Sequence, residues 1–295
     1  MKVIMGPASK ELATKIADLT DYEKIDVISK KFPDGEVYVR LENNVKDENI
    51  AIVQTTSPPQ NDNLLQLAFI ASAAKLAGAK KIIAITPYLA YARQDKIFLQ
   101  GENRSIETIG NILKSSGIDE IITVNIHQEE VLKRFFTIPA KTLSAIPLIA
   151  NYFKKRGYKE AFSLAPDKGA RYIAEQAKKV LGGEVGHLEK HRDRYTGKIS
   201  VSKKSFNVKG KTAIIFDDII STGGTIVKAA KILLDLGAVR VFAACVHPLL
   251  IGDAEDRILN AGVDEVIGTD SVPSRFSKVS LSPLISQEIK AQESG

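Results

Sequence analysis

Short runs of apolar, often β-branched residues alternate with longer amphipathic segments along most of the chain. The short runs are predicted as strands and lie at 2–5, 25–29, 36–40, 50–54, 81–86, 120–125, 161–165, 198–200, 212–216, 240–246 and 265–269. The longer segments are predicted as helices and lie at 8–19, 63–78, 105–117, 144–157, 168–180 and 224–237. Because this alternation is typical of βαβ units, it predicts an α/β protein with mainly parallel sheets flanked by helices.

The pattern occurs twice, which predicts two related domains in tandem. In both halves a helix that ends at glycine is followed by a strand, as in LAGAKKIIAIT and LDLGAVRVFAACV. We expect an N-terminal domain at 1–142 and a C-terminal domain at 143–280. The last segment, 281–295, is expected to form a helix that packs back on the N-terminal domain. The segment 63–78 has nearly continuous apolar residues, so its helix is expected to be deeply buried.

Composition and charge narrow the class of protein. The 295 residues are 44% hydrophobic and 26% charged, as in ordinary globular proteins, and no apolar run approaches the length of a membrane span. The one cysteine, Cys245, excludes an intrachain disulfide and fits a reducing, cytoplasmic setting. It lies in a predicted strand, which favours an inert core thiol. The net charge of +6 is mild and no nucleic-acid motif accompanies it, so small anionic substrates are favoured over nucleic acid or membrane.

The segment IIFDDIISTGGT at 214–225 carries the most specific chemistry. Asp217 and Asp218 follow a predicted buried strand, and ligands of open parallel sheets bind at the carboxyl ends of strands. Carboxylates accept hydrogen bonds from vicinal sugar hydroxyls, whereas a glycine-rich turn before a helix presents N–H groups to a phosphate. An ordinary capped turn is the alternative, but the combination favours a ribose 5-phosphate site. The phosphate-binding residues would be Ser221, Thr222, Gly223, Gly224 and Thr225.

Other predicted loops offer weaker signals. FPDGE at 32–36 presents acidic groups on a turn, which alone would be a plain hairpin. Arg93 and Gln94 follow strand 81–86 and offer donors for phosphate or purine, although a surface ion pair competes for Arg93. His127 follows strand 120–125, and a lone histidine is usually structural. The basic cluster at 187–198 is by itself typical of a solvated hairpin.

Several long motifs, in one order, resemble one family. DDIISTGGT is similar to the phosphoribosyl-diphosphate loop of type I phosphoribosyltransferase-fold proteins. The rest of the chain, from about residue 1 to 290, resembles ribose-phosphate diphosphokinases, also called PRPP synthetases. That resemblance is carried by FPDGEVYVRLENNV, PYLAYARQDK, TVNIHQEEVLKRFFTIPAKTLSAIPLI and SLAPDKGA.

The resemblance implies two phosphoribosyltransferase-like domains and transfer of the diphosphate of ATP to ribose 5-phosphate. It implies a magnesium ion at His127 and Asp167, and two catalytic cations, Lys190 and Arg192, on a loop that closes over the reacting phosphates. Mg²⁺ prefers oxygen ligands, so the histidine is an unusual partner. At least a homodimer is implied as well. The residues implied to bind ATP are Phe32, Asp34, Gly35, Glu36, Arg93 and Gln94.

Two positions depart from the family pattern. His191 stands where relatives usually carry a second arginine, which matters little if that side chain points outward. Lys168, in PDKGA, replaces part of a common Asp-Ala-Gly-Gly turn and adds a charge near the sugar phosphate.

Three other functions remain open from the residues. A phosphoribosyltransferase would use the same loop but needs no ATP motif. A non-catalytic homologue would tend to lose the cations or metal ligands, which are present here. A sugar kinase would transfer only the γ-phosphate and release ADP.

Overall fold

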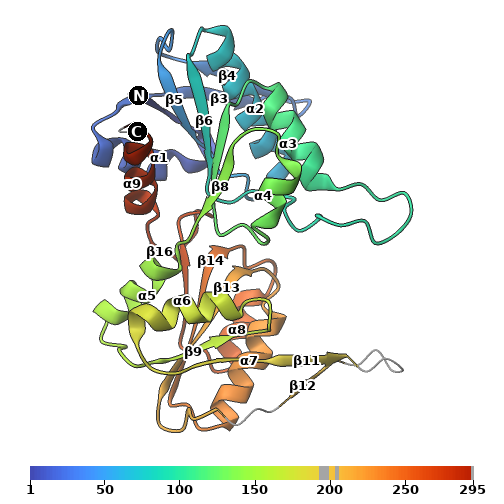
Figure 1. Cartoon of the computed structure of the whole chain (residues 1–295), viewed down its shortest axis with the longest axis vertical. Helices are drawn as coiled ribbons and strands as arrows, with labels where there is room; N and C mark the ends of the chain where they lie inside the picture. The colour runs from blue at the N-terminus through green and yellow to red at the C-terminus, as the bar shows by residue number, and fades with distance from the viewer. Residues whose placement is uncertain (193–198, 203–205, 294–295) are drawn as a thin grey trace. The chain divides into compact units, whose positions relative to one another are not determined.

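The computed structural model describes residues 1–192, 199–202 and 206–293, which form two compact units (Figure 1). The first unit holds Met1–Ser144, Ser271–Pro273 and the C-terminal residues from Ser280. The second holds Ala145–Asp270 and Ser274–Val279. No helix in these described ranges is long and apolar enough to cross a membrane.

The first unit is built on a parallel six-stranded sheet with the order β2-β1-β5-β6-β7-β8. Its strands are β1 (Lys2–Met5), β2 (Glu23–Ile25), β5 (Asn49–Val53), β6 (Lys81–Thr86), β7 (Glu120–Val124) and β8 (Ala140–Leu143). A separate antiparallel hairpin consists of β3 (Val27–Lys31) and β4 (Val37–Leu41). The helical segments are η1 (Pro7–Ser9), α1 (Lys10–Thr20), α2 (Gln60–Leu76), α3 (Ser105–Ser115), α4 (Glu130–Phe135) and α9 (Ser282–Glu293).

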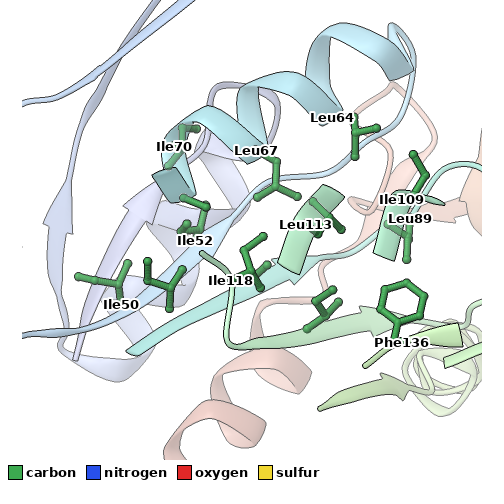
Figure 2. Packing of buried hydrophobic residues seen from close by; sticks show 14 of the residues in the cluster. Ile50, Ile52, Leu64, Leu67, Ile70, Leu89, Ile109, Leu113, Ile118 and Phe136 are labelled. Carbon is green, nitrogen blue, oxygen red and sulfur yellow. The ribbon is translucent and has the colours of Figure 1, made fainter. Parts of the chain in front are cut away.

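Apolar side chains between the sheet and its helices form the core of this unit. Figure 2 shows Leu67 and Ile70 of α2 near Ile52 of β5, with Leu113 of α3 in the same cluster. All four side chains are fully buried, and burial of each such side chain contributes about 1.5–3 kcal/mol. Alternation of strand and helix therefore gives each helix an apolar face for the sheet, as the sequence pattern predicts.

Helix α2 is only partly as predicted. One face is buried, but Leu65, Phe69 and Leu76 are 45%, 41% and 87% exposed. Spacings of four and seven residues place these three on one side of the helix. The expectation of a deeply buried helix is therefore wrong for this side, because the chain itself supplies no element to cover it among the described residues.

The second unit repeats the architecture with the order β10-β9-β13-β14-β15-β16, again parallel throughout. The strands are β9 (Phe162–Ala165), β10 (Val185–His187), β13 (Thr212–Ile220), β14 (Arg240–Pro248), β15 (Glu265–Thr269) and β16 (Ser277–Val279). The antiparallel pair is β11 (Glu189–Arg192) with β12 (Ile199–Ser202). The helices are α5 (Ile146–Lys155), α6 (Arg171–Leu181), α7 (Gly224–Asp235) and α8 (Ala254–Asn260).

An aromatic cluster anchors α5 to this second sheet. The ring of Phe153 lies 6.3 Å from that of Phe216 on β13 and 5.5 Å from that of Phe242 on β14. Cys245 on β14 is fully buried, and burial, followed by the nearby charge of Asp217, raises the pKa of its thiol. It is therefore an inert core thiol.

Both sheets have the same topology when their strands are counted along the chain. The spatial order is second, first, third, fourth, fifth, sixth, and an antiparallel hairpin is inserted between the second and third strands. The predicted fold class of two tandem parallel α/β units is thus confirmed. In each sheet the second strand lies on one side of the first strand, and the third to sixth strands lie on the other side. The boundary between the first and third strands is a topological switch point, and ligands of open α/β sheets bind at such points.

An ion network around the buried Glu120 attaches the C-terminal helix to the first sheet. Glu120 on β7 is 8% exposed, and its carboxylate lies 2.8 Å from Lys81 Nζ and accepts a 2.6 Å hydrogen bond from Gln292 Nε2 of α9. We expect Glu120→Gln to lower the free energy of unfolding by about 1–2 kcal/mol, because a charged acceptor is lost in a water-poor site.

Urea unfolding measures this effect, with Glu107→Gln as the matched control. Glu107 pairs with Arg104 at 2.8 Å at the partly exposed N-terminal end of α3, where loss of an ion pair is expected to cost under about 1 kcal/mol. Equal losses in the two variants would show that the Glu120 network has no special weight.

Candidate active site

The two adjacent aspartates of the second unit lie on the last residues of a strand. β13 continues through Asp217 and Asp218 to Ile220, so the prediction that the strand ends at 216 is wrong. It extends because β14 runs beside it, pairing Asp217 with Cys245 and Ile220 with Pro248. Both carboxylates also accept backbone N–H groups of the next residue, at 2.9 and 2.8 Å. These contacts hold the pair rigidly at the carboxyl end of the strand.

Burial and nearby negative charge disfavour ionisation within this acidic pair. Burial raises the pKa of Asp217 well above its usual value, and the charge of Asp218 raises it further. The carboxylate of Asp167, which follows the neighbouring strand β9, adds to the same effect. Repulsion among close carboxylates favours a ligand that brings hydroxyl donors or positive charge.

A glycine-rich turn follows the aspartates and leads into α7. Gly223, at the N-cap of α7, has a φ of 74°, a left-handed conformation that glycine adopts without strain. It has no side chain to accept the first N–H groups of the helix. Such an end binds anions readily, because N–H groups and the helix dipole point outward together.

The segment 250–257, which follows β14, donates hydrogen bonds to this turn. The carbonyls of Ile220 and Ser221 accept hydrogen bonds from the amides of Leu250 and Ile251, at 2.9 and 3.0 Å. The carbonyl of Thr222 accepts one from Arg257 Nη2 at 3.0 Å. Arg257 was not singled out from the sequence, although its segment follows the carboxyl end of β14 and could have been searched by the same rule.

Asp167 is positioned by a tight turn before α6. Its Oδ1 accepts the amide of Ala170 at 3.1 Å, and its side chain is half-buried. Since Leu164 of β9 pairs with Ile215 of β13, this turn lies beside the acidic pair. The structure thus brings together Asp167, Asp217, Asp218 and the residues 221–225 at the switch point of the second sheet.

The same position in the first unit is filled by side chains. Gln54 and Thr55 follow β5 and are fully buried. Gln54 Oε1 accepts the amide of Ala8 at 3.0 Å, and Thr55 Oγ1 donates to the carbonyl of Ser271 at 2.7 Å. At the switch point of the first sheet, polar groups of the protein therefore bind one another. At the switch point of the second sheet, the corresponding position is available to an anion.

Four predicted residues of the first unit lie at the tip of the β3–β4 hairpin. The Phe32 amide donates to the Glu36 carbonyl at 2.8 Å, and the Glu36 amide donates to Asp34 Oδ1 at 3.1 Å. Phe32 is 40% exposed, its ring lies edge-on to Tyr38 at 6.2 Å, and Lys30 Nζ lies 4.8 Å from its centre. With Gly35 at the turn, the hairpin presents a flat aromatic surface beside two exposed carboxylates.

The other predicted residues of this unit lie at the carboxyl ends of two neighbouring strands. Arg93 is exposed and Gln94 half-buried on the loop after β6. His127 is exposed after β7, the strand that pairs with β6. The structure brings these three to one edge of the sheet, whereas the hairpin tip at 32–36 is a separate feature that packs through β4 on α2.

The predicted catalytic cations are described only by their backbone. Lys190 pairs with Val201 and Arg192 with Ile199 in the β11–β12 ribbon. Their side chains, and residues 193–198 that join the strands, lie outside the described part of the chain.

Known proteins resemble this chain over nearly its whole length. Residues 1–117 match the family model described as the N-terminal domain of ribose phosphate pyrophosphokinase, and residues 199–291 match the phosphoribosyl synthetase-associated domain. A ribose-phosphate pyrophosphokinase of Methanothermobacter thermautotrophicus is 42% identical over 288 residues, covering 98% of this chain and 99% of that protein. The chain belongs to the ribose-phosphate pyrophosphokinase family. A relative of the same name from Saccharolobus solfataricus is 39% identical over 92% of this chain and 93% of its own.

A solved structure of the family has the same fold. Phosphoribosylpyrophosphate synthetase from Mycobacterium smegmatis superposes with a TM-score of 0.88 at 30% identity, covering 100% of this chain and 99% of the other. Family membership explains why both predicted groups of motifs occur in one chain.

The carboxylates of the second unit are oxygen donors of the kind that Mg²⁺ prefers. Mg²⁺ binds through one or two carboxylates together with substrate phosphates and water, and Asp167 lies half-exposed beside the Asp217–Asp218 pair. Within the described ranges, the side chains form no cluster of three or more His, Cys, Asp or Glu that could enclose a metal. His127, an exposed imidazole, supplies a nitrogen ligand, which Mg²⁺ accepts less readily.

Proposed function

We propose that this chain transfers the β,γ-diphosphate of ATP to the anomeric hydroxyl of ribose 5-phosphate. The products are 5-phosphoribosyl 1-diphosphate, a precursor for nucleotide biosynthesis, and AMP. Family membership supports the reaction class. The observation that carries the proposal is the acidic pair, Asp217 and Asp218. This pair lies next to the glycine-rich turn 221–225 at the switch point of the second sheet.

In this proposal the second unit binds the sugar phosphate. Asp217 and Asp218 accept hydrogen bonds from vicinal ribose hydroxyls, and the raised pKa of Asp217 fits a group stabilised by such donors. The 5-phosphate takes the amides and hydroxyls of the turn at the N-terminus of α7. The ligating residues are Ser221, Thr222, Gly223, Gly224 and Thr225.

ATP binds through residues of the first unit. The exposed ring of Phe32 offers a face for the adenine, and Asp34, Gly35 and Glu36 offer acceptors and a backbone turn. Arg93 and Gln94 donate to the nucleotide, with the guanidinium suited to phosphate oxygens. Because the switch point of the first sheet is filled by Gln54 and Thr55, we propose one ribose 5-phosphate site per chain.

The chemical step is an in-line attack by the anomeric oxygen on the β-phosphorus. The oxygen–phosphorus bond to AMP breaks as the new bond forms, AMP carries the leaving electron pair, and the proton of the anomeric hydroxyl is released to solvent. Asp167 in the second unit and His127 in the first would each offer a ligand to magnesium, which would supply positive charge to the phosphates when bound. Lys190 and Arg192 stabilise the charge that gathers on the β-phosphate oxygens, and closure of their loop excludes water. The two aspartates position the sugar hydroxyls.

We further propose at least a homodimer in a cytoplasmic setting. The stripe of Leu65, Phe69 and Leu76 on α2 supports association, because exposed apolar side chains on one helix face are typical of interaction surfaces. The cytoplasmic location is supported by the single buried thiol, Cys245.

Phosphorus NMR of the protein with Mg²⁺, ATP and ribose 5-phosphate tests the reaction. We expect stoichiometric AMP and a sugar-linked diphosphate. ADP and a ribose bisphosphate would instead identify a kinase. Binding of both substrates without turnover would identify a non-catalytic homologue. Consumption of 5-phosphoribosyl 1-diphosphate only with an added nucleobase would identify a phosphoribosyltransferase.

A further inference from the structure

Helix α8 packs directly against the glycine-rich turn 221–225 of the second unit. A Cβ atom built on Gly223 would lie 2.8 Å from Ile258 Cδ1 and 3.3 Å from the carbonyl oxygen of Ala254, both on α8. This close approach leaves no room for a side chain between the turn and the helix. The conformation of the turn is therefore determined from outside its own sequence, by the segment that follows β14.

Three successive carbonyls of the turn are held toward that segment. Those of Ile220 and Ser221 accept backbone amides, and that of Thr222 accepts Arg257 Nη2. In a trans peptide the C=O of one residue and the N–H of the next point in opposite directions. Holding these carbonyls on the α8 side therefore directs the next N–H groups, including that of Gly223, to the opposite side of the turn.

Arg257 differs from the other two donors because it carries a charge. Its Nη2 lies 3.7 Å from the position of a Cβ on Gly224, the first residue of α7. Asp253 Oδ1 lies 3.6 Å from Nη1, so this carboxylate pairs with the other terminal nitrogen of the guanidinium. The guanidinium thus adds positive charge beside the helix N-terminus, where anions are already favoured.

We propose that Arg257 is a positioning residue for the 5-phosphate of ribose 5-phosphate. It orients the peptide between Thr222 and Gly223 so that the N–H faces the phosphate, and it raises the positive potential of the turn. The inference rests on the proposed function, since it assumes that this turn holds the sugar phosphate. It predicts that Arg257 governs the affinity for the phosphorylated sugar, not the chemical step on ATP.

The test compares Arg257→Met and Arg257→Lys with the control Arg275→Met. Arg275 pairs with Glu255 of the same helix, so its loss perturbs α8 without touching the turn. The dissociation constant for ribose 5-phosphate is measured by calorimetry without ATP, and KM and kcat are measured in the full reaction. For Arg257→Met we expect a rise of about tenfold in the dissociation constant and in KM for ribose 5-phosphate, the size of one charged hydrogen bond.

The other readouts separate positioning from a general structural role. The KM for ATP and kcat should stay within about twofold of wild type, since these report the other substrate and the chemical step. Arg257→Lys, which keeps the charge, should recover part of the affinity. Unchanged affinity in Arg257→Met, or an equal loss in Arg275→Met, would overturn the assignment. Wild-type protein that does not bind ribose 5-phosphate at all would overturn the proposed function itself.

Discussion

Replacing Lys190 with alanine is expected to lower kcat about a thousandfold or more, with little change in the affinity for ribose 5-phosphate. A diphosphate carries much of its developing charge on the β-phosphate oxygens during transfer. In the proposed mechanism Lys190 stabilises the transition state more than the bound substrates, because it meets the charge that develops on these oxygens. The loss should therefore fall on kcat and not on ground-state binding, as measured by phosphorus NMR of AMP formation under saturating substrates.

Lys179→Ala is the matched control for this experiment. Lys179 lies exposed on α6 in the same unit, and its removal changes the net charge by the same amount. It should leave kcat within about twofold, because a distant surface charge contributes little in water. A loss of less than about tenfold in Lys190→Ala, with both substrates bound, would remove this lysine from the catalytic step.

The parts of the fold that could be predicted are those decided by local pattern. The strands 81–86 and 265–269 match β6 and β15 to the residue, because each is a buried apolar run bounded by polar positions. The short elements were missed, among them β8, β10, β16, α4 and α8. Helices α4 and α8 have six and seven residues, too few for helical periodicity to be distinguished from chance.

Tertiary contacts account for the other differences between the predicted and the observed elements. Two adjacent aspartates normally end a strand, yet β13 continues through them because β14 pairs with it up to Pro248. The sequence of α2 does not distinguish its buried face from Leu65, Phe69 and Leu76, since the large side chains on both faces are apolar. Which face packs on the sheet depends on the strand register and not on composition.

The candidate site also combines features set by local sequence with features set by tertiary contacts. The sequence alone predicts a ribose 5-phosphate turn at 221–225, because anion binding by glycine and a helix N-terminus is a local property. The place of Arg257 after β14 could be read from the sequence, but its contact with the carbonyl of Thr222, 35 positions earlier, appears only in the structure. The first unit illustrates the converse: its switch point has the same topology, but Gln54 and Thr55 fill it, so topology alone does not create a site.

Gly223→Ala is the second variant for which we expect a large effect, a rise of about a hundredfold in the dissociation constant for ribose 5-phosphate. At a φ of 74° an alanine is strained by about 1–2 kcal/mol. Its Cβ would also press on the end of Ile258 and, at 3.3 Å, on the backbone carbonyl of Ala254. Ile258 can rotate, but the carbonyl cannot retreat without shifting α8. The turn should therefore move away from α8, which breaks the contact between Arg257 and Thr222.

Gly210→Ala separates the cost of backbone strain from the damage to the site. Gly210 has a φ of 73°, nearly the same as Gly223, but a Cβ there would meet nothing within 4 Å. Gly210→Ala should lose about 1–2 kcal/mol of unfolding free energy in urea, and Gly223→Ala at least as much, because both place alanine in the left-handed region. Only Gly223→Ala should also lose affinity for ribose 5-phosphate, since only there does the new methyl group displace the turn. Equal affinities in the two variants would mean that the peptide planes of this turn do not hold the phosphate, and the site would have to be sought at another strand end.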